Sequence, residues 1–136
     1  MPLIRIIIVN FNGGDLLRRC LFALAIQTEQ RFEVVIVDND STDSSLAGVP
    51  DDPRIQIVRS GRNLGFAAGC NRGFENCSTP FIVFLNADAF AQADWLAALL
   101  RAAERYPDAA SFGSLQLRAD NPALLDGAGD VYSCAG

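Results

Sequence analysis

The chain has 136 residues, half of them apolar and a fifth charged, a composition typical of one globular domain that buries roughly two thirds of its unfolded surface. Its net charge of -5 argues against a nucleic-acid backbone as its partner. The absence of histidine excludes Ser-His-Asp and Cys-His nucleophile systems and histidine metal ligands, so any chemistry must use carboxylates, amides, arginines, backbone groups or a metal bound by oxygens.

Apolar runs and helix-period stretches alternate from the start of the chain. Residues 3–9 form a continuous β-branched run with Arg5 inside it, as expected of a strand buried on both faces. Asp15 precedes a helical pattern over residues 16–27 and is the expected N-cap of that helix. Residues 32–37 predict the second strand, and a short helix from residue 43 or 44 leads to the third strand at 55–58.

The second half of the chain continues the alternation. Residues 81–85 predict a fourth strand, and residues 94–106 predict an amphipathic helix. Residues 109–117 are the expected fifth strand, and a turn-rich tail follows it. With a helix over residues 65–77, the order of elements predicts an α/β sandwich around a mainly parallel sheet.

Three glycines, Gly65, Gly69 and Gly73, fall on one face of the helix expected over residues 65–77. Each interior glycine costs a helix about 1 kcal/mol relative to alanine, so the stripe needs a reason. Close packing of this helix against the sheet is the favoured explanation. The alternative is that the bare helix face lets a flat ligand approach.

The cysteines and the apolar segments indicate the compartment. Cys20, Cys70, Cys77 and Cys134 form no C-x-x-C pair, which disfavours zinc and thioredoxin-type sites and favours free thiols in a reducing compartment. The first residues lack a basic leader and a cleavage site, so we expect a strand there and not a signal peptide. No stretch reaches the roughly 18–20 apolar residues of a membrane span. We therefore expect a cytoplasmic protein.

Polar side chains follow three of the expected strands. Asn10 and Asn12 come after the first, the cluster 38–41 after the second, and Asn86 and Asp88 after the fourth. Taken singly, each is a common turn or helix-capping residue. Ligands of parallel sheets bind beyond the carboxyl ends of the strands, so the three clusters together favour one shared site.

The two common phosphate-binding loops are missing from the sequence, since the first strand is followed by NFNGG and no G-x-x-x-x-G-K-[ST] occurs. Asp38 can instead accept a hydrogen bond from the edge of a pyrimidine ring. Asn86 and Asp88 can present oxygens to a ribose and to a divalent cation. Mg²⁺ and Mn²⁺ prefer oxygen ligands, often one or two carboxylates plus substrate phosphates, so an acidic chain can hold a nucleoside diphosphate in this way.

Four segments, VNFNGGDLLRRCL, VDNDSTDSS, RNLGFAAGCNRG and FLNADAFAQADWL, resemble in order the motifs of family 2 glycosyltransferases with the GT-A fold. The similarity is greatest to the rhamnosyltransferase-like branch and covers about residues 6–96. It implies a Rossmann-like α/β/α sandwich that binds a nucleotide-sugar. It also implies a divalent metal, Mg²⁺ or Mn²⁺, and inverting transfer of a hexose from a UDP- or dTDP-sugar to the hydroxyl of a saccharide or lipid-linked acceptor, in cell-wall or polysaccharide synthesis.

The resemblance also implies roles for particular residues. Asp88 takes the place of the metal-binding aspartate of the D-x-D motif, whose first position is here Asn86, a residue without charge. Asp38 would hydrogen-bond the uracil or thymine. The residues expected to bind the nucleotide-sugar are Asn10, Asn12, Asp38, Asn39, Arg62, Asn63 and Asn86.

The resemblance leaves the general base unassigned, because the family's second acidic motif has no clear counterpart in the sequence. Asp126 and Asp130 are candidates only by their charge, and turn formation is the preferred role for both. We expect residues 1–136 to be the nucleotide-binding part of a longer glycosyltransferase domain and not to include its C-terminal half. The missing half would leave apolar surface exposed, which would favour self-association. The saccharide or lipid-linked acceptors of the family would suggest that the enzyme works at the inner face of the membrane. A non-catalytic nucleotide-binding module and a sugar nucleotidyltransferase remain the alternatives.

Overall fold

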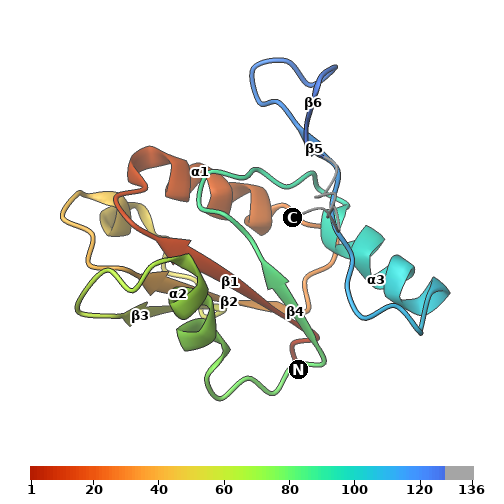
Figure 1. Ribbon diagram of the computed structural model, residues 1–136, viewed down its shortest axis with the longest axis horizontal. Coiled ribbons are helices and arrows are strands. Elements are labelled where there is room, and N and C mark those ends of the chain that lie inside the picture. The colour runs from red at the N-terminus through yellow and green to blue at the C-terminus, as the bar shows by residue number, and fades with distance from the viewer. Residues whose placement is uncertain (128–136) are drawn as a thin grey trace, which may run out of the picture. The chain divides into compact units, whose positions relative to one another are not determined.

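The computed structural model describes residues 1–127, and the chain divides after residue 97 into two compact units. The first unit is built on four parallel strands in the order β3-β2-β1-β4 (Figure 1). Their bounds are β1 Ile4–Asn10, β2 Phe32–Asp38, β3 Ile55–Arg59 and β4 Phe81–Phe84. The expected parallel sheet is therefore confirmed.

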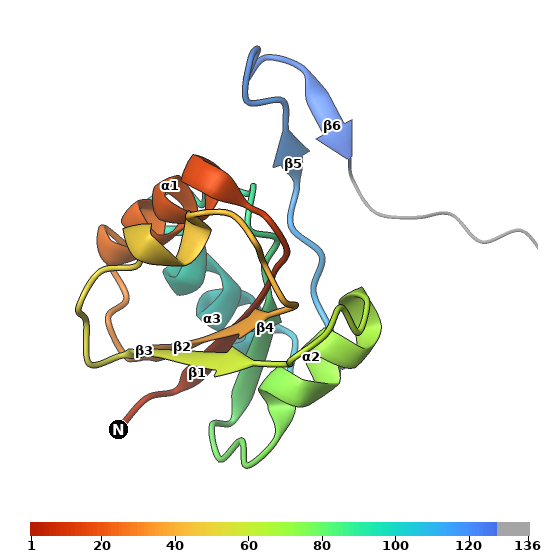
Figure 2. The same ribbon diagram turned by 90° about the vertical axis from the view of Figure 1, so that its left-hand side faces the viewer.

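Helices cover both faces of this sheet. Helix α1 (Gly14–Ala25) and the short 3₁₀ helix η1 (Ser45–Gly48) contact each other on one face, and α2 (Phe66–Phe74) packs on β1 and β2 from the other (Figures 1 and 2). The strands β1 and β2 are buried along almost their whole length, which explains their continuous apolar runs. The core they form with α1 includes Ile4, Ile6, Ile8, Leu17, Leu24, Val34 and Ile36.

Arg5, the charged residue within the first strand, joins β1 to the end of α2. Its Nε donates to Glu33 Oε1 at 2.6 Å, and its Nη1 donates to the carbonyl oxygen of Glu75 at 2.9 Å and to that of Gly73 at 3.3 Å. The last carbonyl groups of a helix have no partner within the helix, so a buried guanidinium there satisfies them. The arginine is thus part of the packing of α2.

Two of the three glycines of α2 are needed for close packing, as expected. A Cβ at Gly69 would lie 2.9 Å from both methyl carbons of Val9, and one at Gly73 would lie 2.5 Å from Ile7 Cγ2. Gly65 differs, because it is the N-cap of α2 with a φ of 79° and lies outside the helical stripe. The expectation of three interior glycines was therefore wrong at Gly65. Glycine is favoured there because it adopts a positive φ without steric cost.

The start of α1 also differs from the expectation. Its N-cap is Gly13, not Asp15, and the helix begins at Gly14. Asp15 lies in the first turn, where its carboxylate accepts a hydrogen bond from Arg18 Nε at 2.7 Å. Its negative charge also interacts favourably with the positive end of the helix dipole. A side chain at Gly13 is excluded because its Cβ would lie 2.4 Å from Asn10 Oδ1.

The second unit holds less regular structure than the sequence predicts. Helix α3 (Trp95–Arg105) spans the boundary between the units, and β5 (Gln116–Leu117) pairs in antiparallel fashion with β6 (Leu125–Gly127). The fifth strand expected over residues 109–117 is thus limited to its last two residues. Asp126 lies exposed in β6 and not in a turn, whereas Asp130 and Cys134 are outside the described residues.

Two further expectations concern thiols and membranes. Cys20, Cys70 and Cys77 are free, and the first two are buried. Within residues 1–127, none of the helices has the length and apolar character needed to cross a bilayer.

Candidate functional site

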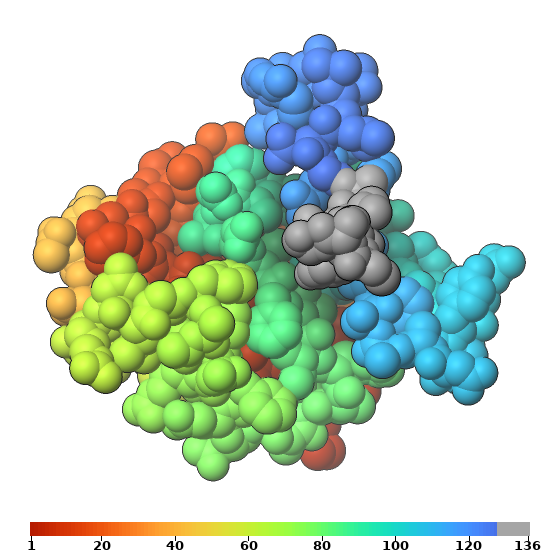
Figure 3. Space-filling view, viewed as in Figure 1, coloured from red at the N-terminus to blue at the C-terminus, as the bar shows by residue number. Residues whose placement is uncertain are grey.

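The polar strand ends meet at one edge of the sheet, as the topology requires. Asn10 at the end of β1 is directly opposite Asp38 at the end of β2, and β4 lies on the other side of β1, where the order of the strands reverses. An open cleft of about 550 Å³ lies there, between the β1–α1 loop, the start of α2 and the loop after β4, segments that adjoin in Figure 3. It is lined by Val9, Phe11, Asn12, Gly13, Leu16, Asn39, Asn63, Gly65, Phe66, Asn86, Ala87 and Asp88.

Asn10 and Asp38 lie outside this lining and are buried, at 0% and 2% exposure. Asn10 Nδ2 donates to Asp38 Oδ1 at 3.1 Å and to the hydroxyl groups of Ser41 and Ser45 at 2.9 and 3.0 Å. The second carboxylate oxygen of Asp38 accepts from the backbone N–H of Ser41. In this structure both residues hold together the loops that end β1 and β2.

Asn12 lines the cleft and also clamps the loop after β2. Its Oδ1 accepts from the backbone N–H groups of Thr42 at 2.8 Å and Asp43 at 3.3 Å, and its own N–H donates to the Ser41 hydroxyl. Asp43, in the loop after β2, in turn accepts a hydrogen bond from the backbone N–H of Gly14 at 2.9 Å. The Ser45 hydroxyl, together with backbone donors, holds the pKa of Asp43 below its usual value, so this clamp stays ionised at neutral pH.

Asn39 presents a buried acceptor at the cleft. Its Nδ2 donates to the carbonyl oxygen of Gly65 at 3.0 Å, and since that oxygen can only accept, the amide orientation is fixed. The other amide atom, Oδ1, is buried without a partner among residues 1–127. A buried acceptor left unpaired costs about 1–3 kcal/mol, so a donor brought by a ligand would be favoured at this point.

The remaining expected residues divide between the lining and its surroundings. Asn63, Asn86 and Asp88 line the cleft, with Asn63 Oδ1 also accepting from the N–H of Gly65 at 2.9 Å. Arg62 is exposed next to Asn63 but is not part of the lining. The structure thus brings Asn12, Asn39, Asn63, Asn86 and Asp88 together, with Asn10 and Asp38 buried nearby.

The donor groups suit a divalent cation shared with a ligand. Asn86 and Asp88 are exposed and offer one amide oxygen and one carboxylate on the same wall. In the described part of the chain, no three His, Cys, Asp or Glu side chains gather to hold a metal by themselves. Mg²⁺ and Mn²⁺ often take one or two protein oxygens and complete their shell with phosphates and water, so this donor set fits a metal that arrives with a diphosphate.

Two aromatic side chains at the cleft were missed from the sequence. Phe11 and Phe66 line it and are 51% and 55% exposed, so they offer apolar surface to a ligand. Phe11 lies between the two asparagines of the first strand end, and Phe66 begins α2. For Phe11, its position between Asn10 and Asn12 was the available signal, whereas Phe66, between Gly65 and Ala67, offered none.

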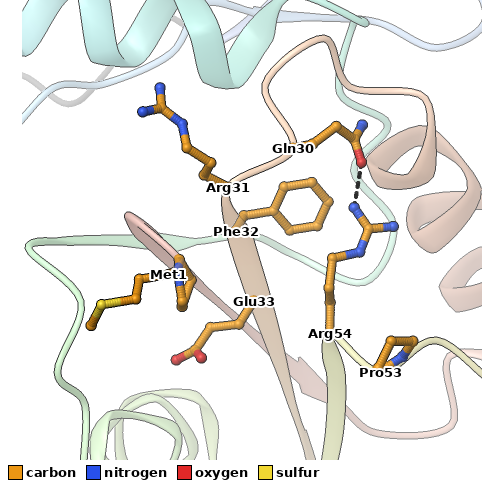
Figure 4. A pocket seen from close by; sticks show the side chains of 8 residues that line it. Met1, Gln30, Arg31, Phe32, Glu33, Pro53 and Arg54 are labelled. Carbon is orange, nitrogen blue, oxygen red and sulfur yellow. Dashed lines mark hydrogen bonds between the residues drawn. The ribbon is translucent and has the colours of Figure 1, made fainter.

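A second hollow, of about 350 Å³, lies between the amino ends of β2 and β3 (Figure 4). Each charged side chain of its lining pairs with a charged neighbour outside the lining. Arg54 binds Asp52 and Gln30, Glu33 binds Arg5, and Arg31 binds Glu29. The first cleft, with its unpaired acceptor and exposed carboxylate, is therefore the better candidate.

Comparison with known proteins gives a consistent result. Residues 5–127 match the profile described as "Glycosyl transferase family 2". An N-acetylglucosaminyl-diphospho-decaprenol L-rhamnosyltransferase of Mycobacterium tuberculosis is 29% identical over 96% of this chain and 44% of its own length. An uncharacterized glycosyltransferase of Haemophilus influenzae is 32% identical over 71% of this chain and 40% of its own length. The chain thus spans less than half the length of these relatives.

Solved structures match the fold. S. aureus TarS 1-349 in complex with UDP-GlcNAc superposes with a TM-score of 0.71 at 22% identity, over 79% of this chain and 32% of that one. The mannosyltransferase PcManGT from Pyrobaculum calidifontis in complex with GDP-Man and Mn²⁺ gives 0.67 at 22% identity, over 86% and 35%. The fold is accordingly GT-A, as the sequence motifs implied.

Proposed function

Because this chain belongs to glycosyl transferase family 2, we propose that it is the nucleotide-sugar-binding part of an inverting glycosyltransferase. The proposed reaction moves a hexose, rhamnose in the first instance, from a UDP- or dTDP-sugar to an acceptor hydroxyl. The observation that carries the proposal is that one cleft presents the unpartnered acceptor of Asn39 and the exposed carboxylate of Asp88.

The cleft offers groups for each part of a nucleoside diphosphate. The Asn39 carbonyl oxygen can accept from the ring N–H of uracil or thymine, and Phe11 and Phe66 provide apolar surface beside it. In this geometry Asn39 is better placed for the base than Asp38, whose oxygens are already engaged. Asn86 and Asp88 would hold a metal-bound diphosphate, and Arg62 would approach it from the rim.

The proposed chemistry is a direct displacement at the anomeric carbon. The acceptor oxygen forms the new bond from the face opposite the leaving group, while the bond to the diphosphate breaks and its electron pair leaves with the nucleotide. A bound divalent cation supplies Lewis-acid stabilisation of that leaving group. Asp88 and Asn86 orient the diphosphate for this step, and the general base that takes the acceptor proton has no residue assigned to it.

The sequence motifs and one relative support the rhamnose and acceptor assignments. The mycobacterial protein, by its name, transfers L-rhamnose to N-acetylglucosaminyl-diphospho-decaprenol. A lipid-linked saccharide acceptor at the inner face of the membrane is the corresponding proposal for this chain.

Calorimetric titration with UDP and dTDP, with and without Mn²⁺, tests the proposal. We expect Mn²⁺ to strengthen nucleotide binding in the wild type and Asp88→Ala to abolish that gain, because it removes the one carboxylate of the donor set. Asp51→Ala, which removes an exposed carboxylate outside the cleft, is the matched control and should keep the gain. A full Mn²⁺ gain in Asp88→Ala would leave Asp88 without a role in metal binding.

A further inference from the structure

Residues of α1 and of the segment directly after it contact the loop that carries Asn86 and Asp88. Arg19 stacks over the ring of Phe90, with its guanidinium carbon 4.4 Å from the ring centre. The thiol of Cys20 lies 3.6 Å from the carbonyl oxygen of Asn86, within range of an S–H donor. Beyond the helix end, the N–H of Thr28 donates to the Ala93 carbonyl at 2.7 Å.

Gln27 makes the most extensive of these contacts. Its side chain is buried, at 3% exposure, and its Nε2 donates to the Gln92 carbonyl at 2.6 Å and to the Ala23 carbonyl at 3.1 Å. Its Oε1 accepts from the backbone N–H of Leu96 at 3.0 Å. Both amide hydrogens and the amide oxygen therefore have partners, and the orientation of the amide is fixed by two carbonyls that can only accept.

This amide ties the far end of the loop to α1. Gln92 precedes α3, Leu96 lies in its first turn and is fully buried, and Ala23 is in the last turn of α1. By contrast, within residues 1–127 the start of the loop has one backbone hydrogen bond of its own, from the Ala89 N–H to the Asn86 carbonyl. The exposed side chains of Asn86 and Asp88 thus depend on contacts with α1 for their position.

We propose that Gln27 is a positioning residue for the proposed metal-binding loop, fixing through its three hydrogen bonds where Asp88 stands in the cleft. This inference rests on the proposed function of Asp88. A site with only two protein oxygens gains its affinity from their correct placement relative to the phosphates. Groups that orient metal ligands typically change metal affinity by about 10- to 100-fold when they are removed.

The test compares Gln27→Met with a matched control. Methionine keeps the length and volume of glutamine but makes none of the three hydrogen bonds. Gln30→Met is the control, because it removes a glutamine side chain of the same segment that contacts Arg54 and the backbone carbonyl of Gln27 but not the loop after β4. Arg19→Ala is the second variant, which removes the contact with Phe90 from an exposed position and leaves the buried amide intact.

The first measurement is hydrogen–deuterium exchange of the free chain, which needs neither nucleotide nor metal. We expect Gln27→Met to speed exchange at least 10-fold in peptides covering residues 86–96, while peptides of β1 and β2 keep their protection. Gln30→Met should leave residues 86–96 unchanged. Equal protection of these residues in Gln27→Met and wild type would overturn the proposal.

The second measurement is the Mn²⁺-dependent gain in UDP affinity. In Gln27→Met this gain should fall by about 10-fold, while metal-free UDP binding stays within 2-fold, since Asn39 and Phe11 belong to the loops after β2 and β1. Arg19→Ala should lower the gain in the same direction by a smaller factor. A gain that survives despite faster loop exchange would overturn the positioning role. If the wild type shows no Mn²⁺-dependent gain in UDP affinity, that result would count against the proposed function and against the metal-positioning role. The exchange data would still decide whether Gln27 orders the loop.

Discussion

At the scale of single residues, the site depends on which of two neighbours faces the cleft. The motif after β2 offers Asp38 and Asn39, and adjacent residues of an extended chain point to opposite sides. The structure directs Asp38 toward Asn10 and Ser41 and places Asn39 in the lining. The sequence predicts the cluster but not which member contacts a ligand, because that choice depends on the turn that follows the strand.

Substitution of Asn39 tests its proposed contact with the base. Asn39→Leu keeps a similar volume but removes both the unpartnered carbonyl oxygen and the Nδ2 donor to the Gly65 carbonyl, so UDP affinity should fall by at least about 5- to 10-fold, the value of one hydrogen bond. The Mn²⁺-dependent gain should not change, because Asp88 is intact. Asn71→Leu, an exposed asparagine of α2 outside the lining, is the calorimetric control. Equal UDP affinity for Asn39→Leu and wild type would remove Asn39 from the site.

At the scale of elements, patterns within one segment predict better than features that need a partner. The strands β1 and β2 were predicted within a residue or two because burial on both faces gives them continuous apolar runs. The strand expected at residues 109–117 lacks such a run of β-branched residues, and only Gln116–Leu117 pair. A strand exists only where another strand offers hydrogen bonds, and composition does not report that. The sequence pattern likewise does not report that α1 is capped at Gly13, where a Cβ would lie 2.4 Å from Asn10 Oδ1.

The contact of α2 with the sheet provides a prediction at this scale. Gly73→Ala would place a methyl group 2.5 Å from Ile7 Cγ2 and 3.2 Å from Val37 Cγ2. Ile7 belongs to a central strand and cannot move freely, so the free energy of unfolding should fall by about 1–3 kcal/mol. Gly113→Ala is the control, since its Cβ would meet no atom within 4 Å, and it should change stability by less than about 0.5 kcal/mol. Urea denaturation measures both, and equal stability of the two variants would contradict close packing at α2.

At the scale of the whole molecule, the nucleotide half of the proposed site is better defined than the acceptor half. Motifs spread over four segments converge on one edge of the sheet, which explains why the sequence predicted the fold and the place of the cleft. The general base stays unassigned, since Asp126 lies exposed in β6. The outer strand β4 exposes Phe81, Ile82 and Phe84, so the self-association expected from the sequence stays a prediction for sedimentation experiments.

The charge distribution predicts how stability changes with pH. The chain has no histidine, so no side chain of that type changes charge between pH 5 and 7, and stability should be flat there. Below pH 5, the carboxylates that are paired with arginines determine how stability changes with pH. Hydrogen bonds from Arg31 lower the pKa of Glu29 to about 2, and those from Arg54 lower the pKa of Asp52.

A carboxyl group with a lowered pKa in the folded state stabilises the fold above its unfolded pKa, because there the unfolded chain binds more protons. That stabilisation is lost as the pH falls through the folded pKa, so stability should decline from about pH 4.5 toward pH 2. Glu29→Gln should make the decline shallower, whereas Glu104→Gln, at an exposed position of α3, should leave it unchanged. Both are measured by urea denaturation between pH 2 and 7. A loss of stability already between pH 5 and 7 would contradict this account, because it would require a titrating group that neither the composition nor the paired carboxylates supply.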